Sequence, residues 1–330
     1  MTYLVTPTLG RRSSHSHKDP KMKLIIYNII GLLAISASAS VIADSNSDLS
    51  ISGEVNAGLI NNSALSVDEI DNVSDESDSG NEIGIKLNAQ WLPNEKFKLV
   101  TGYSYQQQNY NKFSQFDLAL HQVNIDTSYQ LNTGEIGVRL DAATASLATK
   151  TFLDFQQATM YYGLFIQPQT YIRTSFKIKN KSFAELTNRD AEALAVSADI
   201  FHFTNNANTM LMVGFNIEEE TAINEAFTFK GLGFGTKVSH KFTLFGLGSQ
   251  IGLDWRYQVK DYMSIENVEA ESQEGTQRDE NRQVITATWS VDILDNLAIK
   301  TELESGDYGS DQDSLTYKQN VASVGISYKW

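Results

Sequence analysis

Charged residues recur at every second position inside long stretches whose other positions are apolar. Residues two apart in an extended strand point to the same face, so these charges share one face of each strand. Such a face offers ion pairing and contact with polar solutes. Ten charged residues are candidates for the lining of a polar interior: Lys86, Lys98, Arg139, Asp141, Arg173, Lys177, Asp254, Arg256, Lys300 and Glu302.

Over all predicted strands, the face that carries these charges has twelve basic and eleven acidic side chains. An interior lined by this face would be close to charge-balanced. Opposed basic and acidic rows would create a transverse field that favours dipolar solutes. Alternatively, the charges pair across neighbouring strands and hold the wall together. The remaining members are Lys237, Lys241, Lys260, Arg282, Lys329, Glu54, Glu82, Asp126, Glu135, Asp199, Glu218, Asp292 and Glu304.

The residue types that carry catalysis or hold metals form no motif in this sequence. His121, His202 and His240 fall on the apolar parity, and no serine and acid stand beside them at a spacing that indicates a triad. The absence of cysteine excludes disulfides and thiolate metal sites. The acids between residues 68 and 78 do not follow the spacing of a calcium loop. The sequence therefore predicts no enzymatic activity, no metal and no cofactor.

The chain ends on an alternating strand with an aromatic terminus. Val324, Ile326, Tyr328 and Trp330 share the apolar parity, while the other parity is small or polar. Outer-membrane β-barrels of Gram-negative bacteria often end in this way. We therefore interpret these four residues as an assembly signal for the barrel assembly machinery.

The first 43 residues do not belong to this strand pattern. Residues 22–43 read as a cleaved signal peptide, with Lys23, an apolar core at 24–35 and a small-residue cleavage site at 41–43. That core is well short of the roughly 20 residues that span a membrane. Residues 1–21 carry no apolar run, so they indicate a misassigned upstream start or an extended leader.

The remaining segment, 44–330, scans as fourteen strands whose connections alternate in length. Strands are predicted at 48–60, 82–92, 96–107, 117–131, 134–145, 156–167, 170–179, 191–203, 209–218, 228–242, 246–263, 282–294, 297–305 and 318–330. Longer loops are predicted at 61–81, 108–116, 146–155, 180–190, 219–227, 264–281 and 306–317. Short turns on one rim and long loops on the other are typical of outer-membrane barrels. We therefore expect an all-β, antiparallel up-and-down transmembrane barrel with both termini on the periplasmic rim.

The formal net charge of −14 is concentrated in the longer loops. Acids cluster at 68–78, at 266–280 and at 307–313. One interpretation is a solvated, flexible rim. The other is bridging by divalent cations to lipopolysaccharide, or repulsion of anionic solutes at the mouth.

The closing strands resemble a known family. The resemblance covers about the last 55 residues, through the segments 278–282, 284–293, 297–304, 314–320 and 324–330. They resemble the end of the barrel domain of surface lipoprotein assembly modifiers, whose barrels also have fourteen strands. The sequence shows no helical repeat domain of that family, and it ends in Trp330 where Phe is usual.

These patterns lead to two functional hypotheses. The first is a porin-like channel for small polar solutes in the outer membrane of a Gram-negative bacterium, exported by the general secretory route. The alternative, implied by the resemblance, is a barrel that exports a surface lipoprotein client. Expected partners are outer-membrane lipid, lipopolysaccharide, the barrel assembly machinery and periplasmic chaperones, but no nucleic acid.

Overall fold

The computed structural model describes residues 48–263 and 278–330. The proposed signal peptide at 22–43, the segment 1–21 and most of the acidic loop 264–281 lie outside these residues. Among the described residues, no helix is long and apolar enough to cross a membrane.

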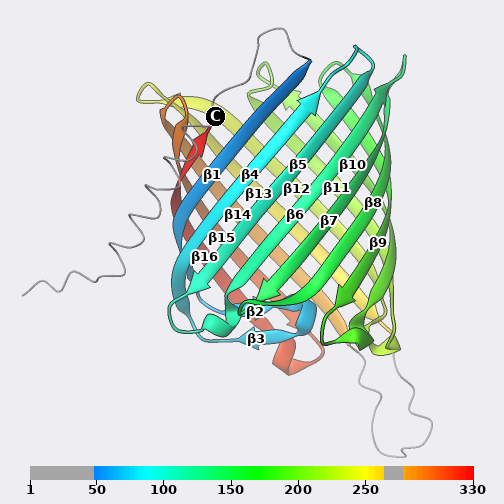
Figure 1. Cartoon of the computed structure of the whole chain (residues 1–330), viewed down its shortest axis with the longest axis vertical. Helices are drawn as coiled ribbons and strands as arrows, with labels where there is room; N and C mark the ends of the chain where they lie inside the picture. Colours follow the sequence, from blue (N-terminus) through cyan, green and yellow to red (C-terminus); the bar gives the residue numbers. More distant parts are fainter. Residues whose placement is uncertain (1–47, 264–277) are drawn as a thin grey trace, which may run out of the picture. The chain divides into compact units, whose positions relative to one another are not determined.

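Alternating sequence stretches form strands that pair in chain order into one closed antiparallel barrel (Figure 1). β1 pairs with β4 on one side and with β16 on the other, which closes the ring. The barrel strands are β1 (Leu49–Asn62), β4 (Asp78–Trp91), β5 (Phe97–Tyr110), β6 (Leu118–Gln130), β7 (Glu135–Leu147), β8 (Lys150–Gln167), β9 (Thr170–Phe183), β10 (Ala191–Thr204), β11 (Thr209–Ala222), β12 (Phe229–Leu244), β13 (Leu247–Tyr262), β14 (Asp279–Leu294), β15 (Leu297–Ser310) and β16 (Tyr317–Lys329).

This architecture confirms the predicted fold class, including the fourteen strands and their antiparallel order. The strands run 13 to 18 residues, and most are longer than predicted, although β6 and β13 are shorter. The extra residues lie at the rim with the longer loops, as in β9, which continues to Phe183, and β11, which continues to Ala222. Polar side chains misled the sequence reading there, because a strand that emerges from a membrane no longer needs an apolar face.

One predicted loop is wrong. Residues 146–155 are not a long loop, because β7 and β8 are joined by Ala148 and Thr149 alone. Both residues have positive φ, 46° and 73°, as a two-residue hairpin turn requires. The sequence offers neither Gly nor Asn at this point, so nothing marked the turn.

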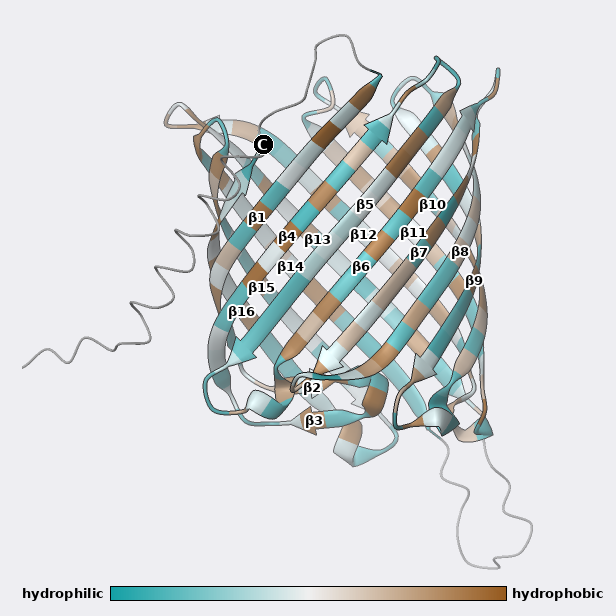
Figure 2. Ribbon diagram, viewed as in Figure 1, coloured by the Kyte–Doolittle hydropathy of each residue, from teal (hydrophilic) through white to brown (hydrophobic). Residues whose placement is uncertain are grey.

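The outer surface of the barrel is apolar between its rims. Large aliphatic and aromatic side chains on the outward parity are exposed. Figure 2 shows that hydrophobic residues recur along the facing strands. Examples are Ile51, Leu59, Val123, Ile125, Met160, Leu194, Val196, Phe215, Ile217, Leu232, Leu253 and Leu303. A water-soluble barrel would bury such residues, whereas a membrane barrel presents them to lipid.

The proposed assembly signal lies on the seam where the barrel closes. Val324, Ile326 and Tyr328 in β16 stand opposite Leu59, Ala57 and Val55 in β1. The backbone of Trp330 exchanges two hydrogen bonds with Gly53, each 3.1 Å long. The last residue therefore takes part in the pairing of the first and last strands.

Candidate functional site in the barrel lumen

The segment between β1 and β4, which we call loop 63–77, packs against the inner wall at one mouth of the barrel. It contains β2 (Leu65–Val67), a single 3-10 turn η1 (Asp68–Ile70) and β3 (Asn72–Ser74). Figure 1 shows β2 and β3 at the end of the barrel opposite the C-terminus. We call that end the loop rim, and the end that carries the C-terminus the turn rim.

Apolar residues anchor the loop. Leu65 is only 1% exposed, and it clusters with Val67 and Phe116. Ala64 is 2% exposed and lies in a second cluster with residues of β14, β15 and β16. Both buried apolar clusters of the described structure thus include this loop, which identifies it as a packed element.

Ion pairs tie the acidic tip of the loop to the wall at the start of β14 and at β9 and β10. The carboxylate of Asp71 accepts hydrogen bonds of 2.9 and 2.6 Å from the guanidinium of Arg278, just before β14. It also accepts one from Arg189, in the 3-10 turn η3 (Thr187–Arg189) between β9 and β10. Glu69 accepts a hydrogen bond of 3.0 Å from Lys181 in β9.

The contacts of Asp68 hold the loop to the wall close to β1. Its carboxylate oxygens accept hydrogen bonds from Arg282 at 2.9 Å and from the hydroxyl of Tyr317 at 2.7 Å. β9 and β10 lie about halfway around the strand order from β1, where the loop begins. The loop therefore reaches across the lumen and narrows the mouth.

For four of the six acids at 68–78, these contacts correct the interpretation as a flexible, solvated rim, whereas Asp75 and Glu76 are exposed. Asp68, Glu69 and Asp71 are held by cations of the wall. Asp78 is 4% exposed and accepts backbone N–H groups of Lys112 and Phe113. Burial alone would raise the pKa of Asp71, but the hydrogen bonds from Arg278 and Arg189 hold it below 3.8. The pKa of Glu69 is held below 4.5 in the same way, mainly by Lys181.

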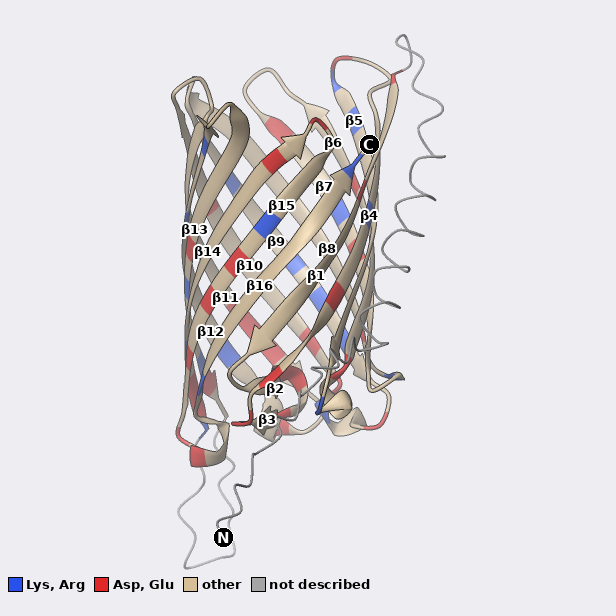
Figure 3. Cartoon of the chain, turned by 90° about the vertical axis from the view of Figure 1, so that its left-hand side faces the viewer, with Lys and Arg blue, Asp and Glu red and all other residues tan. Residues whose placement is uncertain are grey.

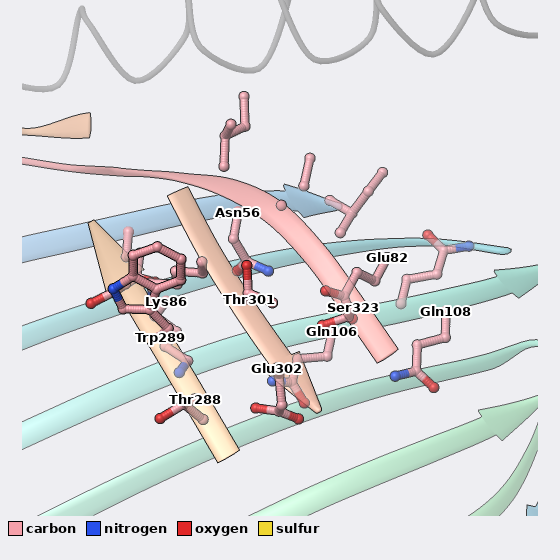
Figure 4. Close-up of a pocket in the computed structure, with 18 of the residues that line it drawn as sticks. Asn56, Glu82, Lys86, Gln106, Gln108, Thr288, Trp289, Thr301, Glu302 and Ser323 are labelled. Atoms are coloured by element: carbon pink, nitrogen blue, oxygen red, sulfur yellow. The ribbon is translucent and has the colours of Figure 1, made fainter. Parts of the chain in front are cut away.

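The described residues enclose two adjoining cavities in the lumen. The larger, of about 780 Å³, is bounded by loop 63–77 and the strand ends near the loop rim. The smaller, of about 500 Å³, lies against β1, β4, β5 and β13 to β16 (Figure 4). Glu82, Gln108, Leu120, Glu302 and Ser323 line both, so the two cavities are adjoining parts of one lumen.

Six of the ten predicted lining residues take part in ion pairs. Arg139 holds Asp141 at 2.7 Å along β7, and Arg256 holds Asp254 at 3.0 Å along β13. Arg173 in β9 approaches Asp199 in β10 at 3.4 Å. Lys300 in β15 pairs with Glu54 in β1, across β16.

The other four predicted residues, Lys86, Lys98, Lys177 and Glu302, make no ion pair within 4.0 Å of any described residue. Of these, Lys86 and Glu302 line the smaller cavity, together with Lys300 from the first group. Figure 3 shows basic and acidic residues at many heights along the strands, which is the distribution that a polar interior requires.

Sequence reasoning missed the cations that hold loop 63–77. Lys181, Arg189 and Arg278 were assigned to loops, although Lys177, Lys179 and Lys181 share one parity. That continued alternation was a usable signal for Lys181, which pairs with Glu220 at 3.1 Å as well as with Glu69. Arg189 and Arg278 carry no such signal, because they precede their strands.

The three histidines of the described residues form hydrogen bonds with hydroxyl groups on neighbouring strands. His121 lies 3.0 Å from Tyr103, His202 lies 2.9 Å from Thr170, and His240 lies 2.8 Å from Thr209. Within residues 48–263 and 278–330, no group of three or more potential metal ligands is arranged to hold an ion.

Comparison with known proteins gives similarity at the level of fold. No family model matches the sequence, and no curated protein matches it. The resemblance to surface lipoprotein assembly modifiers therefore has no support from these searches.

Solved structures of outer-membrane barrels match over most of the chain. The trimer form of OmpT, an outer membrane protein of Vibrio cholerae, superposes with a TM-score of 0.50 at 8% identity, covering 86% of this chain and 99% of that one. An anion-selective porin from Comamonas acidovorans gives 0.49 at 9% identity, with coverage of 86% and 99%. OccAB3 from Acinetobacter baumannii gives 0.43 at 10% identity, again with coverage of 86% and 99%. The closed barrel and its superposition on OmpT show that the chain has the fold of an outer-membrane β-barrel, in agreement with the predicted fold class and localisation.

Proposed function

We propose that this barrel is a passive channel for small polar solutes and not an enzyme. The observation that carries the proposal is the pair of adjoining cavities, of about 780 and 500 Å³, lined by charges of both signs and by amides. Charged side chains cost about 2–4 kcal/mol when they face lipid at the midplane, so a polar lining of this kind belongs to a wet lumen.

The crossing of loop 63–77 supports a narrow channel. Its ion pairs leave the larger cavity beneath it, so the loop restricts the mouth without filling the lumen. A restricted mouth suits solutes the size of a sugar or an amino acid better than folded proteins. The alternative of lipoprotein export gains no support from this geometry.

The orientation and partners form part of the same proposal. The turn rim with the C-terminus would face the periplasm, where chaperones and the barrel assembly machinery would receive the strand that ends at Trp330. The loop rim would face the outside, close to lipopolysaccharide. Solutes would then meet loop 63–77 before the smaller cavity.

Planar-bilayer recording of the purified, refolded barrel in KCl tests the proposal. We expect discrete single-channel steps, and swelling of proteoliposomes in a small neutral sugar. A preparation from cells without the gene is the control for contaminating porins. Folded, heat-modifiable protein that gives neither steps nor swelling would overturn the channel function.

A further inference from the structure

The smaller cavity is recessed into the wall where the barrel closes. Glycines occupy inward positions on three adjacent strands, Gly84 in β4, Gly58 in β1 and Gly325 in β16. A Cβ at Gly58 would stand 3.0 Å from Oε1 of Glu82, so the Glu82 carboxylate lies over this glycine. The side chain of Asn56 covers Gly84 in the same way, with Oδ1 2.2 Å from the place of a Cβ.

The charges around this recess divide into a matched pair and an unmatched set. Lys300 and Glu54 neutralise each other, and Ser327 donates a further hydrogen bond of 3.0 Å to Glu54. Glu82, Glu302 and Lys86 line the same cavity, and none of them has an ion-pair partner within 4.0 Å among the described residues. Glu82 and Glu302 also both line the larger cavity that adjoins this one.

The unmatched charges are separated along the wall. Lys86 and Glu82 lie on the same face of β4, four residues and so about 13 Å apart. In Figure 4, Lys86 lies on one side of the cavity, and Glu82 and Gln108 lie on the other. Side-chain amides of Asn56, Gln106 and Gln108 stand between and beside them, so hydrogen-bond donors and acceptors surround the space.

We infer that this recess is a binding site for amino-acid-like solutes that carry a carboxylate and one or two cationic groups. The solute carboxylate would meet Lys86, and its ammonium groups would meet Glu82 and Glu302. The unmatched protein charges sum to −1, so a cationic amino acid complements them best. This inference rests on the proposed channel function, and it adds a substrate class to it.

The test uses two probes that share one cationic chain. L-Lysine carries the carboxylate, and cadaverine is the diamine that lacks it. We expect lysine to reduce the KCl current of the open channel in a saturable manner. Glu82→Gln together with Glu302→Gln should weaken the apparent affinity for both probes at least about tenfold, because both lose their anionic partners.

The variant Lys86→Gln distinguishes the two probes. It should weaken lysine binding at least about fivefold and should not weaken cadaverine binding, since only lysine offers a carboxylate and Lys86 repels ammonium groups. The matched control is Asp307→Asn at the exposed rim, which should change neither probe. An equal loss for both probes in Lys86→Gln, or a loss in the rim control, would overturn the site.

Calorimetric titration of the folded barrel with lysine separates this site from the channel function. Binding without current would refute the channel and retain the site, whereas current without saturable lysine binding would refute the site alone. If the double variant does not fold, Glu302→Gln carries the test, because this side chain is exposed to the lumen. Heat-modifiable mobility verifies folding of each variant.

Discussion

Asp71 and Arg278 are joined by two hydrogen bonds, of 2.9 and 2.6 Å, although 207 residues separate them in the chain. The two side chains are 17% and 10% exposed. Asp71 also adopts a left-handed backbone conformation, with φ of 53°, directly after the 3-10 turn of loop 63–77. The pair therefore fixes the tip of the loop to the wall at the start of β14, three strands from β1 in the ring.

Replacement of Asp71 by Asn should release this tip. Hydrogen bonds to charged groups contribute about 1.5–3 kcal/mol. The substitution removes the negative charge of the group that accepts hydrogen bonds from Arg278 and Arg189. We expect a larger and noisier single-channel conductance, while the barrel still folds. The matched control is Asp307→Asn, since the pair of Asp307 with Lys318 is exposed and should contribute little. An unchanged conductance in Asp71→Asn would mean that the loop does not limit the current.

The same pair predicts a pH dependence. The pKa of Asp71 lies below its ordinary value of 3.8 when the loop is closed. The ionised carboxylate stabilises the closed loop fully when the pH is above the ordinary pKa. This stabilisation is lost as the pH falls through the depressed pKa. Conductance should therefore show no loop-dependent change between pH 8 and 5, and should rise below about pH 4. The difference between the conductance–pH profiles of the wild type and Asp71→Asn isolates the contribution of Asp71. An equal rise in conductance at low pH in the variant would assign the rise to other carboxyl groups.

The barrel itself was predictable from the sequence, because a transmembrane strand must alternate its side chains over its whole length. Alternation in segments such as 246–263 and 297–305 fixed which parity faces outward. The tight turn at Ala148 and Thr149 was not predictable, since neither residue type favours positive φ.

Loop 63–77 could not be placed from the sequence for a different reason. Its acids looked like a solvated rim, because the cations that bind them come from residues 181, 189, 278 and 282, more than a hundred positions away. Long-range ion pairs leave no local pattern. The unmatched charge of Lys86 and Glu302 was equally hidden, since the sequence gives the face of a charge but not its partner.

The seam between β1 and β16 predicts a position that tolerates no side chain. A Cβ at Gly325 would stand 2.6 Å from the carbonyl oxygen of Ala57 and 2.9 Å from Cα of Gly58. Both contacts are with backbone, which cannot rotate away, so Gly325→Ala should cost about 1–3 kcal/mol. Gly233→Ala is the control, because its Cβ would meet Asn216 at an ordinary 3.6 Å. The midpoint of urea unfolding in lipid vesicles measures both, and equal midpoints would contradict the tight seam.

Trp330→Ala should lower the amount of folded barrel in the membrane. The ring of Trp330 lies over Gly53, where a Cβ would stand 2.1 Å from it, and it stacks near Tyr328 at 6.2 Å. Its backbone hydrogen bonds survive the substitution, so the loss measures the aromatic ring alone. Trp330→Phe should restore most of the yield, because an aromatic face still covers Gly53. Heat-modifiable protein in outer-membrane fractions is the measurement.

Two yields distinguish the causes of a loss, the yield in cells and the yield of refolding in detergent. Reduced yield in cells with normal refolding in detergent would point to recognition by the assembly machinery, and a loss in both would point to the seam. An unchanged yield in both would contradict the role assigned to this residue.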